Sequence, residues 1–288
     1  MLTTLRNNII TKVASRHVAG ADIQDALQVC RWANGEGYHS ILSPWAGIDE
    51  SPRNMFERYK LNIATLSTEN LNCYLSMKLD AIGFDFGLFK EILEFGQMHN
   101  VRVHVDSLGP DSAPTKYRFL EKAAEFSKFL GCTLPSRWKR SLDDADKAVA
   151  LGLAVRIVKG QWEDTGNRVD CKKNYLAIAE RLAGRAHYVG VATHDLPLAE
   201  KVLACLTSLD TYCELEQFFS LPLNGRATAK RLGRPYRIYV AYGHPGVPYN
   251  VRFALTRPSI AAWMLADYTL RLKKPWSHFD GHRLVFSF

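Results

Sequence analysis

The chain lacks both a membrane-spanning segment and a cysteine pattern that would form a disulfide framework. No uninterrupted apolar run reaches about 18 residues, the length expected of a transmembrane helix. The six cysteines are scattered, without a CxxC pair, and we interpret them as free thiols in a reducing compartment. The N-terminal stretch alternates polar and apolar residues and has no continuous hydrophobic core of a signal peptide. These absences predict a cytoplasmic protein without stable membrane insertion.

Signatures of nucleic-acid binding and of metal sites are also missing. Lys and Arg outnumber Asp and Glu by 37 to 29, a net charge of +8, yet no run of basic residues reaches five. This argues against nucleic acid as a partner and leaves an anionic cofactor, substrate or membrane surface. The nine histidines show neither HExxH nor HxH spacing, so no metal site is predicted from spacing alone.

Short runs rich in β-branched residues alternate with longer amphipathic segments along the chain. Amphipathic stretches such as 86–100 and 116–131 separate them, and the interval of about 25 to 35 residues is that of one βα unit. Eight strands are predicted, at residues 39–42, 73–79, 101–106, 132–135, 154–159, 188–193, 211–215 and 236–242. Eight such units can form a doubly wound sheet or a closed barrel. Because no GxGxxG follows the first strand, we predict an α/β fold, a (β/α)8 barrel of TIM type.

The chain shows no Gly/Ser/Pro-rich linker that would divide it. We predict a helical segment over residues 1–36 and one barrel domain over residues 37–288.

Polar and charged residues stand at the ends of at least five predicted strands. Catalytic groups of (β/α)8 barrels lie at the C-terminal ends of the strands, so we expect one polar pocket at the barrel mouth. Its excess of cations suits an anionic cofactor or substrate. The residues are Lys78, Asp106, Arg156, Lys159, Thr193, His194, Asp195, Glu214, Glu216, Tyr239 and Tyr242.

A metal-dependent barrel hydrolase stays open as an alternative at this point. It would use His194 together with His104 and Asp106, which share one face of a strand. That face supplies at most two inward ligands, fewer than a catalytic zinc ion usually takes from the protein.

Six short motifs occur in order between about residue 37 and residue 266. Val155-Arg-Ile-Val-Lys-Gly160 is similar to Arg-Leu-Val-Lys-Gly, and Ala192-Thr-His-Asp195 to Ala-Thr-His-Asn. The other four are Ser76-Met-Lys-Leu79, Val105-Asp106, Arg237-Ile-Tyr-Val-Ala-Tyr-Gly243 and Tyr249-Asn-Val-Arg252. Taken together they resemble the FAD-dependent proline dehydrogenases, the flavoenzymes of proline utilisation, of which the chain would be a divergent member.

The resemblance implies FAD as the cofactor and a barrel whose last helix lies at the mouth. It assigns catalytic positions to Lys78, Asp106 and Arg156, with Arg156 bonding the flavin near N5. Cofactor contacts fall on Arg156, Val158, Lys159, Gly160, Thr193 and His194. Substrate contacts fall on Lys78, Tyr239 and Arg252, with Arg252 binding the carboxylate.

The implied reaction is transfer of a hydride from the ring carbon beside nitrogen of a proline-like amino acid to flavin N5. In the family a quinone reoxidises the flavin, so a quinone is the expected electron acceptor. The basic surface would then help the protein to associate peripherally with a membrane.

The chain departs from the family pattern in its substrate half. The family's last helix begins Arg-Arg-x-x-Glu, whereas Phe253 and Thr256 replace the second Arg and the Glu. Gln161-Trp162 stands where Ala-Tyr would be, and Pro135 stands where a Gln would bond the flavin. Three classes of function remain: a flavin oxidoreductase, a metal-dependent barrel hydrolase, and a non-catalytic barrel that binds flavin or another ligand. For the oxidoreductase, the substrate is either free proline or a modified or carrier-linked proline derivative of secondary metabolism.

Overall fold

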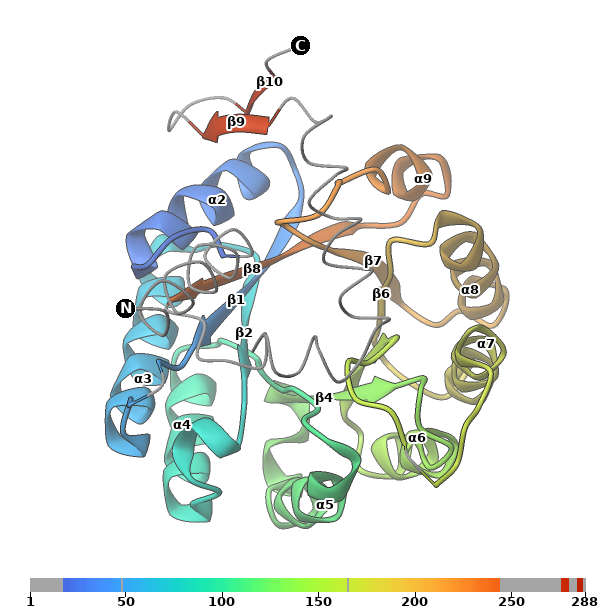
Figure 1. The fold of residues 1–288 in the computed structure, drawn as a ribbon, viewed down its shortest axis with the longest axis horizontal. Helices are drawn as coiled ribbons and strands as arrows, with labels where there is room; N and C mark the ends of the chain where they lie inside the picture. The colour runs from blue at the N-terminus through green and yellow to red at the C-terminus, as the bar shows by residue number, and fades with distance from the viewer. Residues whose placement is uncertain (1–17, 48, 165, 244–275, 280–283, 287–288) are drawn as a thin grey trace, which may run out of the picture.

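Eight parallel strands close into a barrel (Figure 1). The computed structural model describes residues 18–47, 49–164, 166–243, 276–279 and 284–286. Each strand pairs with the next in the chain, and β8 pairs with β1. The (β/α)8 barrel is therefore confirmed over the doubly wound sheet. The strands are β1 (His39–Trp45), β2 (Cys73–Met77), β3 (Val103–Val105), β4 (Leu130–Pro135), β5 (Ala154–Val158), β6 (Val189–Ala192), β7 (Cys213–Phe218) and β8 (Tyr236–Gly243).

Helices surround the barrel and follow each of the strands β1 to β7 (Figure 1). They are α2 (Ile23–Gly35), which precedes β1, α3 (Pro52–Glu69), α4 (Phe86–Met98), α5 (Ala113–Lys122), α6 (Ser141–Ala150), α7 (Cys171–Leu182), α8 (Leu196–Ser208) and α9 (Arg226–Arg231). A separate antiparallel pair joins β9 (Trp276–Phe279) and β10 (Leu284–Phe286). Of the helices that the structure describes, none is both long and apolar enough to span a membrane.

Several helices begin at a capping side chain that follows a strand end. Asp170 accepts hydrogen bonds from Lys172 N and Lys173 N, and Asp195 accepts one from Leu198 N. These carboxylates satisfy amide donors of the first helical turn, each worth about 1 kcal/mol. Asp195, which the sequence suggested for the pocket, therefore starts α8, and its other oxygen lies 2.5 Å from Lys172 Nζ.

The amphipathic segment 116–131 does not form one helix. α5 ends at Lys122, and a 3-10 helix, η4 (Ala124–Phe129), follows it. This tighter coil buries Phe126 and lets β4 begin at Leu130, two residues before the predicted start. The predicted helical segment 1–36 contains α2, while its residues 1–17 lie outside the described part, as does the expected last helix within 244–275.

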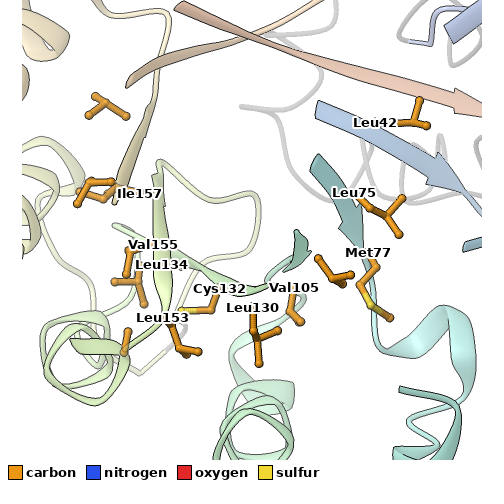
Figure 2. Packing of buried hydrophobic residues seen from close by; sticks show 14 of the residues in the cluster. Leu42, Leu75, Met77, Val105, Leu130, Cys132, Leu134, Leu153, Val155 and Ile157 are labelled. Atoms are coloured by element: carbon orange, nitrogen blue, oxygen red, sulfur yellow. The ribbon is translucent and has the colours of Figure 1, made fainter. Parts of the chain in front are cut away.

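The outward face of the strands carries the main apolar core. Leu42, Leu75, Val105, Cys132 and Val155 come from the first five strands and are fully buried in one cluster with helix residues (Figure 2). Full burial of a side chain such as leucine or valine stabilises the fold by about 1.5–3 kcal/mol. This layer holds the helices on the barrel.

The inward face of the barrel is polar and charged, although such interiors are usually filled by branched apolar side chains. Contacts between strands that are not neighbours identify the inward residues. Tyr74 of β2 donates to Glu216 of β7 at 3.0 Å, and Arg156 of β5 donates to Ser76 of β2 at 3.2 Å. His104 packs with its ring centroid 5.4 Å from that of Tyr74.

Two strand glycines make room for these polar side chains. A Cβ atom on Gly131 would lie 2.2 Å from His104 Nδ1, and one on Gly190 would lie 2.2 Å from Glu216 Oε1. Both distances are far below van der Waals contact. The inward positions on β4 and β6 therefore have to be glycine for His104 and Glu216 to stay where they are.

Candidate active site

A cavity of about 680 Å³ lies where the strands of the barrel end. Its volume is in the range of sites that bind small molecules and cofactors, about 300–1,000 Å³. Nine residues that the sequence placed in the pocket or at the cofactor line it: Asp106, Arg156, Val158, Lys159, Gly160, Thr193, His194, Glu216 and Tyr239. The structure therefore gathers most of the predicted site residues into one cavity.

Arg156 is the buried centre of this cavity. Its Nη2 atom donates to Thr133 Oγ1 at 3.0 Å and to Ser76 Oγ at 3.2 Å, and it forms a close ion pair with Asp106 Oδ1. The Arg156 side chain is 4% exposed and that of Asp106 11% exposed. Burial alone would raise the pKa of Asp106, but Arg156 and Lys78 together lower it, so the carboxylate stays ionised.

Lys78 and Tyr239 hold the other oxygen of Asp106. Lys78 Nζ lies 3.4 Å from Asp106 Oδ2, and the Tyr239 hydroxyl donates to the same oxygen at 3.1 Å. The Tyr239 hydroxyl also shares a hydrogen bond of 2.7 Å with Ser43, and its ring stacks on Phe218 with centroids 5.3 Å apart. Asp106 thus fixes two cations and a phenol around one side of the cavity.

His194 stands at the cavity with both ring nitrogens in hydrogen bonds. Nε2 accepts from Phe218 N at 3.0 Å, and Nδ1 lies 3.2 Å from the carbonyl oxygen of Pro222. A carbonyl can only accept, so the ring is assigned as neutral with its proton on Nδ1. Within the described residues, no group of three His, Cys, Asp or Glu side chains is arranged to hold a metal ion.

Solved structures with the same barrel are domains of longer proteins. Proline utilization A from Bdellovibrio bacteriovorus, inactivated by N-propargylglycine, has a TM-score of 0.75 at 15% identity over 91% of this chain. Proline utilization A from Corynebacterium freiburgense has a TM-score of 0.67 at 14% identity over 99% of this chain. The chain covers 34% and 35% of those proteins, about a third of their length. At 15% and 14% sequence identity, the likeness to these two structures establishes the fold alone.

Curated relatives match most of the chain over most of their own length. It is 22% identical over 273 residues to proline dehydrogenase 2 of Bacillus subtilis (strain 168), covering 89% of this chain and 90% of that protein. It is 23% identical over 271 residues to proline dehydrogenase 1 of the same strain, covering 88% and 89%. The chain is a divergent relative of the proline dehydrogenases. No family model matches it.

The departures from the proline dehydrogenase pattern fall partly on the cavity. Pro135 and Arg137 line it, and Arg137 Nε donates to the carbonyl oxygen of Gly160 at 2.9 Å. The carbonyl oxygen of Trp162 accepts from the indole of Trp138 at 2.8 Å, which ties the loop after β5 to the end of β4. The expected carboxylate ligand Arg252, with its altered neighbours Phe253 and Thr256, lies outside the described residues.

Two residues expected at the mouth of this proline dehydrogenase-like barrel lie elsewhere. Glu214 is paired with Arg237 at 2.5 Å and with His39 at 2.9 Å, at the opposite end of the barrel where β1, β7 and β8 begin. The Tyr242 hydroxyl donates to Asn62 of α3, so its side chain points outward. Tyr242 is three residues from the inward Tyr239, and alternation along a strand puts the two on opposite faces.

Several residues that line the cavity or contact Arg156 were not expected from the sequence. Ser76 and Thr133 orient Arg156, and each lies two residues before a recognised strand-end position, on the same face of its strand. That spacing could have identified both residues. Trp138 and Leu221 lie beyond the strands, where no periodicity indicates a direction.

Glu214 and Glu216 are expected to make opposite contributions to the pH dependence of stability. Burial raises the pKa of Glu216, and Arg156 only partly opposes it, so its stabilising contribution is present at low pH and lost as pH rises. Burial would also raise the pKa of Glu214, but His39 and Arg237 hold it far below its usual range. Its contribution is therefore present above the pKa of an unfolded glutamate, about 4.3, and is lost as pH falls below it.

Urea unfolding of Glu214→Gln and Glu216→Gln at pH 4 and pH 8 measures this difference. We expect Glu214→Gln to lower the free energy of unfolding at pH 8 by about 3–5 kcal/mol, because Arg237 loses its buried partner, and by less at pH 4. We expect Glu216→Gln to be close to wild type at pH 4 and more stable than wild type at pH 8. Losses of the same size in both variants at both pH values would contradict the assignment.

Proposed function

We propose that the chain is a flavoenzyme that uses FAD to oxidise proline or a proline-derived cyclic amino acid. The observation that carries the proposal is the environment of Arg156. This buried guanidinium lines the cavity, and its Nε and Nη1 atoms have no hydrogen-bond partner in the described part of the chain. Buried donors are nearly always satisfied, so these two nitrogen atoms are suited to donate to an acceptor on a bound cofactor.

The residues around the cavity fit an anionic dinucleotide. Lys159 and Arg137 supply positive charge, and Gly160, at a φ of +87°, brings backbone close without a side chain. Val158, Thr193 and His194 line the same side of the cavity and would contact the cofactor. Pro135 offers no hydrogen-bond donor where the family has glutamine, so Arg156 would carry more of the flavin's orientation. Bound FAD would supply the two-electron acceptor, taking a hydride at N5 from the carbon next to the ring nitrogen.

The chain's own part in the reaction is to orient the substrate and keep its amine neutral. Lys78, Asp106 and Tyr239 form one hydrogen-bonded unit, in which the Tyr239 ring would pack on the substrate ring. The surplus of cations in the cavity disfavours the positively charged ammonium form of the substrate. The neutral amine keeps a lone pair on nitrogen, and this lone pair assists loss of the hydride. Arg252 is proposed to bind the carboxylate.

A modified or carrier-linked proline is the second candidate substrate. Trp138, Phe218 and Leu221 give the cavity an apolar wall, in keeping with a derivative whose carboxylate is masked.

We further propose that residues 37–288 act as one catalytic domain and that a quinone reoxidises the flavin. A net charge of +8 would favour peripheral contact with an anionic membrane during that step.

The purified protein loaded with FAD tests the proposal directly. We expect oxidised-flavin absorbance that bleaches when L-proline is added without oxygen. The matched control is L-prolinamide, which keeps the ring and masks the carboxylate. Faster bleaching by the amide would favour the modified substrate. A protein that takes up no flavin, or a flavin that neither compound reduces, would contradict the proposal.

A further inference from the structure

A line of ionisable side chains crosses the barrel interior from the cavity to the opposite end. Glu216 Oε1 lies 3.0 Å from the Tyr188 hydroxyl, and that hydroxyl lies 3.2 Å from Glu214 Oε2. Glu214 Oε1 lies 2.9 Å from His39 Nδ1. Each step is within the distance over which a proton can pass directly between heavy atoms.

The two ends of this line meet different surroundings. Glu216 lines the cavity, and its Oε2 atom has no hydrogen-bond partner among the described residues. His39 begins β1 at the other end of the barrel, and its side chain is 22% exposed. Tyr212, which donates to Glu214 Oε1 at 2.8 Å, is 46% exposed at the same end. The line therefore joins the cavity to solvent on the far side of the barrel.

The charges around Glu216 allow it to hold a proton. The groups facing it are Tyr74, Arg156, Tyr175, Tyr188, Glu214 and Arg237. Burial raises the pKa of Glu216, whereas His39 and Arg237 lower that of Glu214. A proton in this line consequently rests on Glu216 and occupies Glu214 only in passing, before His39 transfers it to water.

We propose that this line releases the substrate's proton to solvent through the N-terminal end of the barrel, an inference that rests on the proposed function. The substrate's ammonium N–H bond breaks and its proton moves to the Glu216 carboxylate. The neutral amine would then form the C=N bond with its lone pair while the C–H bond breaks, and bound FAD would supply the acceptor for the hydride. Glu216 passes its proton to the Tyr188 oxygen while the Tyr188 hydroxyl proton moves to Glu214. Glu214 then passes that second proton to His39, which releases a proton to water.

An exit at the far end has a physical advantage. With a cofactor and substrate in the cavity, water is displaced from the mouth, and a proton left beside Arg156 and Lys78 would raise the energy of an already cationic site. The barrel interior removes it without opening the mouth.

Tyr188→Phe and Tyr74→Phe form a matched pair of variants. Both hydroxyls donate to Glu216 Oε1 at 3.0 Å, and Arg102 lies over both rings at 4.0 and 4.1 Å. Only the Tyr188 hydroxyl also reaches Glu214. With anaerobic substrate, a pH-indicator dye follows proton release and the flavin band follows reduction. We expect Tyr188→Phe to slow proton release by about tenfold or more, and Tyr74→Phe by less than about twofold.

Two further measurements do not depend on turnover of the Tyr188 variant. In flavin-free protein, the infrared band of a protonated carboxyl should titrate above the usual range of glutamate and be absent in Glu216→Gln. In His39→Ala, proton release should slow and recover when imidazole is added.

The outcomes separate this inference from the function on which it rests. If wild type reduces its flavin and releases protons no faster than Tyr188→Phe, the relay is wrong and the proposed function stands. Equal slowing in Tyr188→Phe and Tyr74→Phe would also overturn the relay, since it would reflect only the loss of a donor to Glu216. If substrate never reduces wild-type flavin, both proposals fail.

Discussion

Arg156→Ala is expected to abolish flavin reduction and to lower the free energy of unfolding by about 3–5 kcal/mol. The stability loss follows because Asp106 would remain as a buried carboxylate whose ion pair with Lys78, at 3.4 Å, is the one left among the described residues. The loss of reduction follows because Arg156 carries the two nitrogen atoms, Nε and Nη1, that are proposed to orient the cofactor. Urea unfolding measures the first effect, and anaerobic bleaching of the flavin measures the second.

Two control variants show whether the effects of Arg156→Ala come from the lost charge, from the lost planar guanidinium, or from the loss of any buried ion pair. Arg156→Lys keeps the charge but loses the planar fork, so stability should recover more than flavin reduction does. Arg140→Ala removes a comparable ion pair with the buried Asp144 outside this cavity. It should lower stability without changing flavin reduction. Full reduction in Arg156→Ala would refute the role assigned to this guanidinium.

Gly160→Ala is expected to destabilise the barrel by about 2–4 kcal/mol and to weaken flavin binding. At a φ of +87°, an alanine is strained, and its Cβ would lie 2.7 Å from the Cβ of Pro135. Both atoms belong to the wall of the cavity, so relief of the clash has to move β4 or the loop after β5.

Gly37→Ala is the matched control for this change. Its φ is +76°, but a Cβ there would meet nothing within 4 Å, so only the backbone strain of about 1–2 kcal/mol applies. Thermal unfolding and FAD titration of both variants test the comparison. Equal losses would show that contact with Pro135 does not matter. Unchanged FAD affinity in Gly160→Ala would remove Gly160 from the proposed cofactor site.

The sequence predicts the barrel well because its signals are local and repeated. Each strand is a short β-branched run and each helix an amphipathic one, and eight repetitions leave few alternatives. The cavity residues were predictable for a related reason: strand ends such as Asp106 and Lys159 share one end of a parallel barrel whatever the detailed packing. The division of segment 116–131 was not predictable, because apolar spacing does not distinguish one α-helix from α5 followed by a 3-10 helix.

The sequence does not resolve depth within the barrel. Glu214 and Glu216 are two residues apart and face the same way, so periodicity places both inside. One step of two residues moves a side chain by about 6.6 Å along the strand, enough to separate the cavity from the opposite end. Which end each carboxylate reaches depends on the stagger between strands, and that is set only when the barrel closes.

We expect the ion pairs between β1, β7 and β8 inside the barrel to form late in folding, when β8 pairs with β1. These strands pair over seven residues, and the Arg237 and His39 side chains that meet there are 198 positions apart in the chain. Such distant pairing is slow, because loop closure has to precede any gain from contact. Until β8 docks, Glu214 has no guanidinium partner and the open sheet presents a bare carboxylate near its unpaired edge. A nascent chain that stalls one strand short therefore carries charge on the edge most prone to pair with another chain, which protects the unfinished barrel from aggregation.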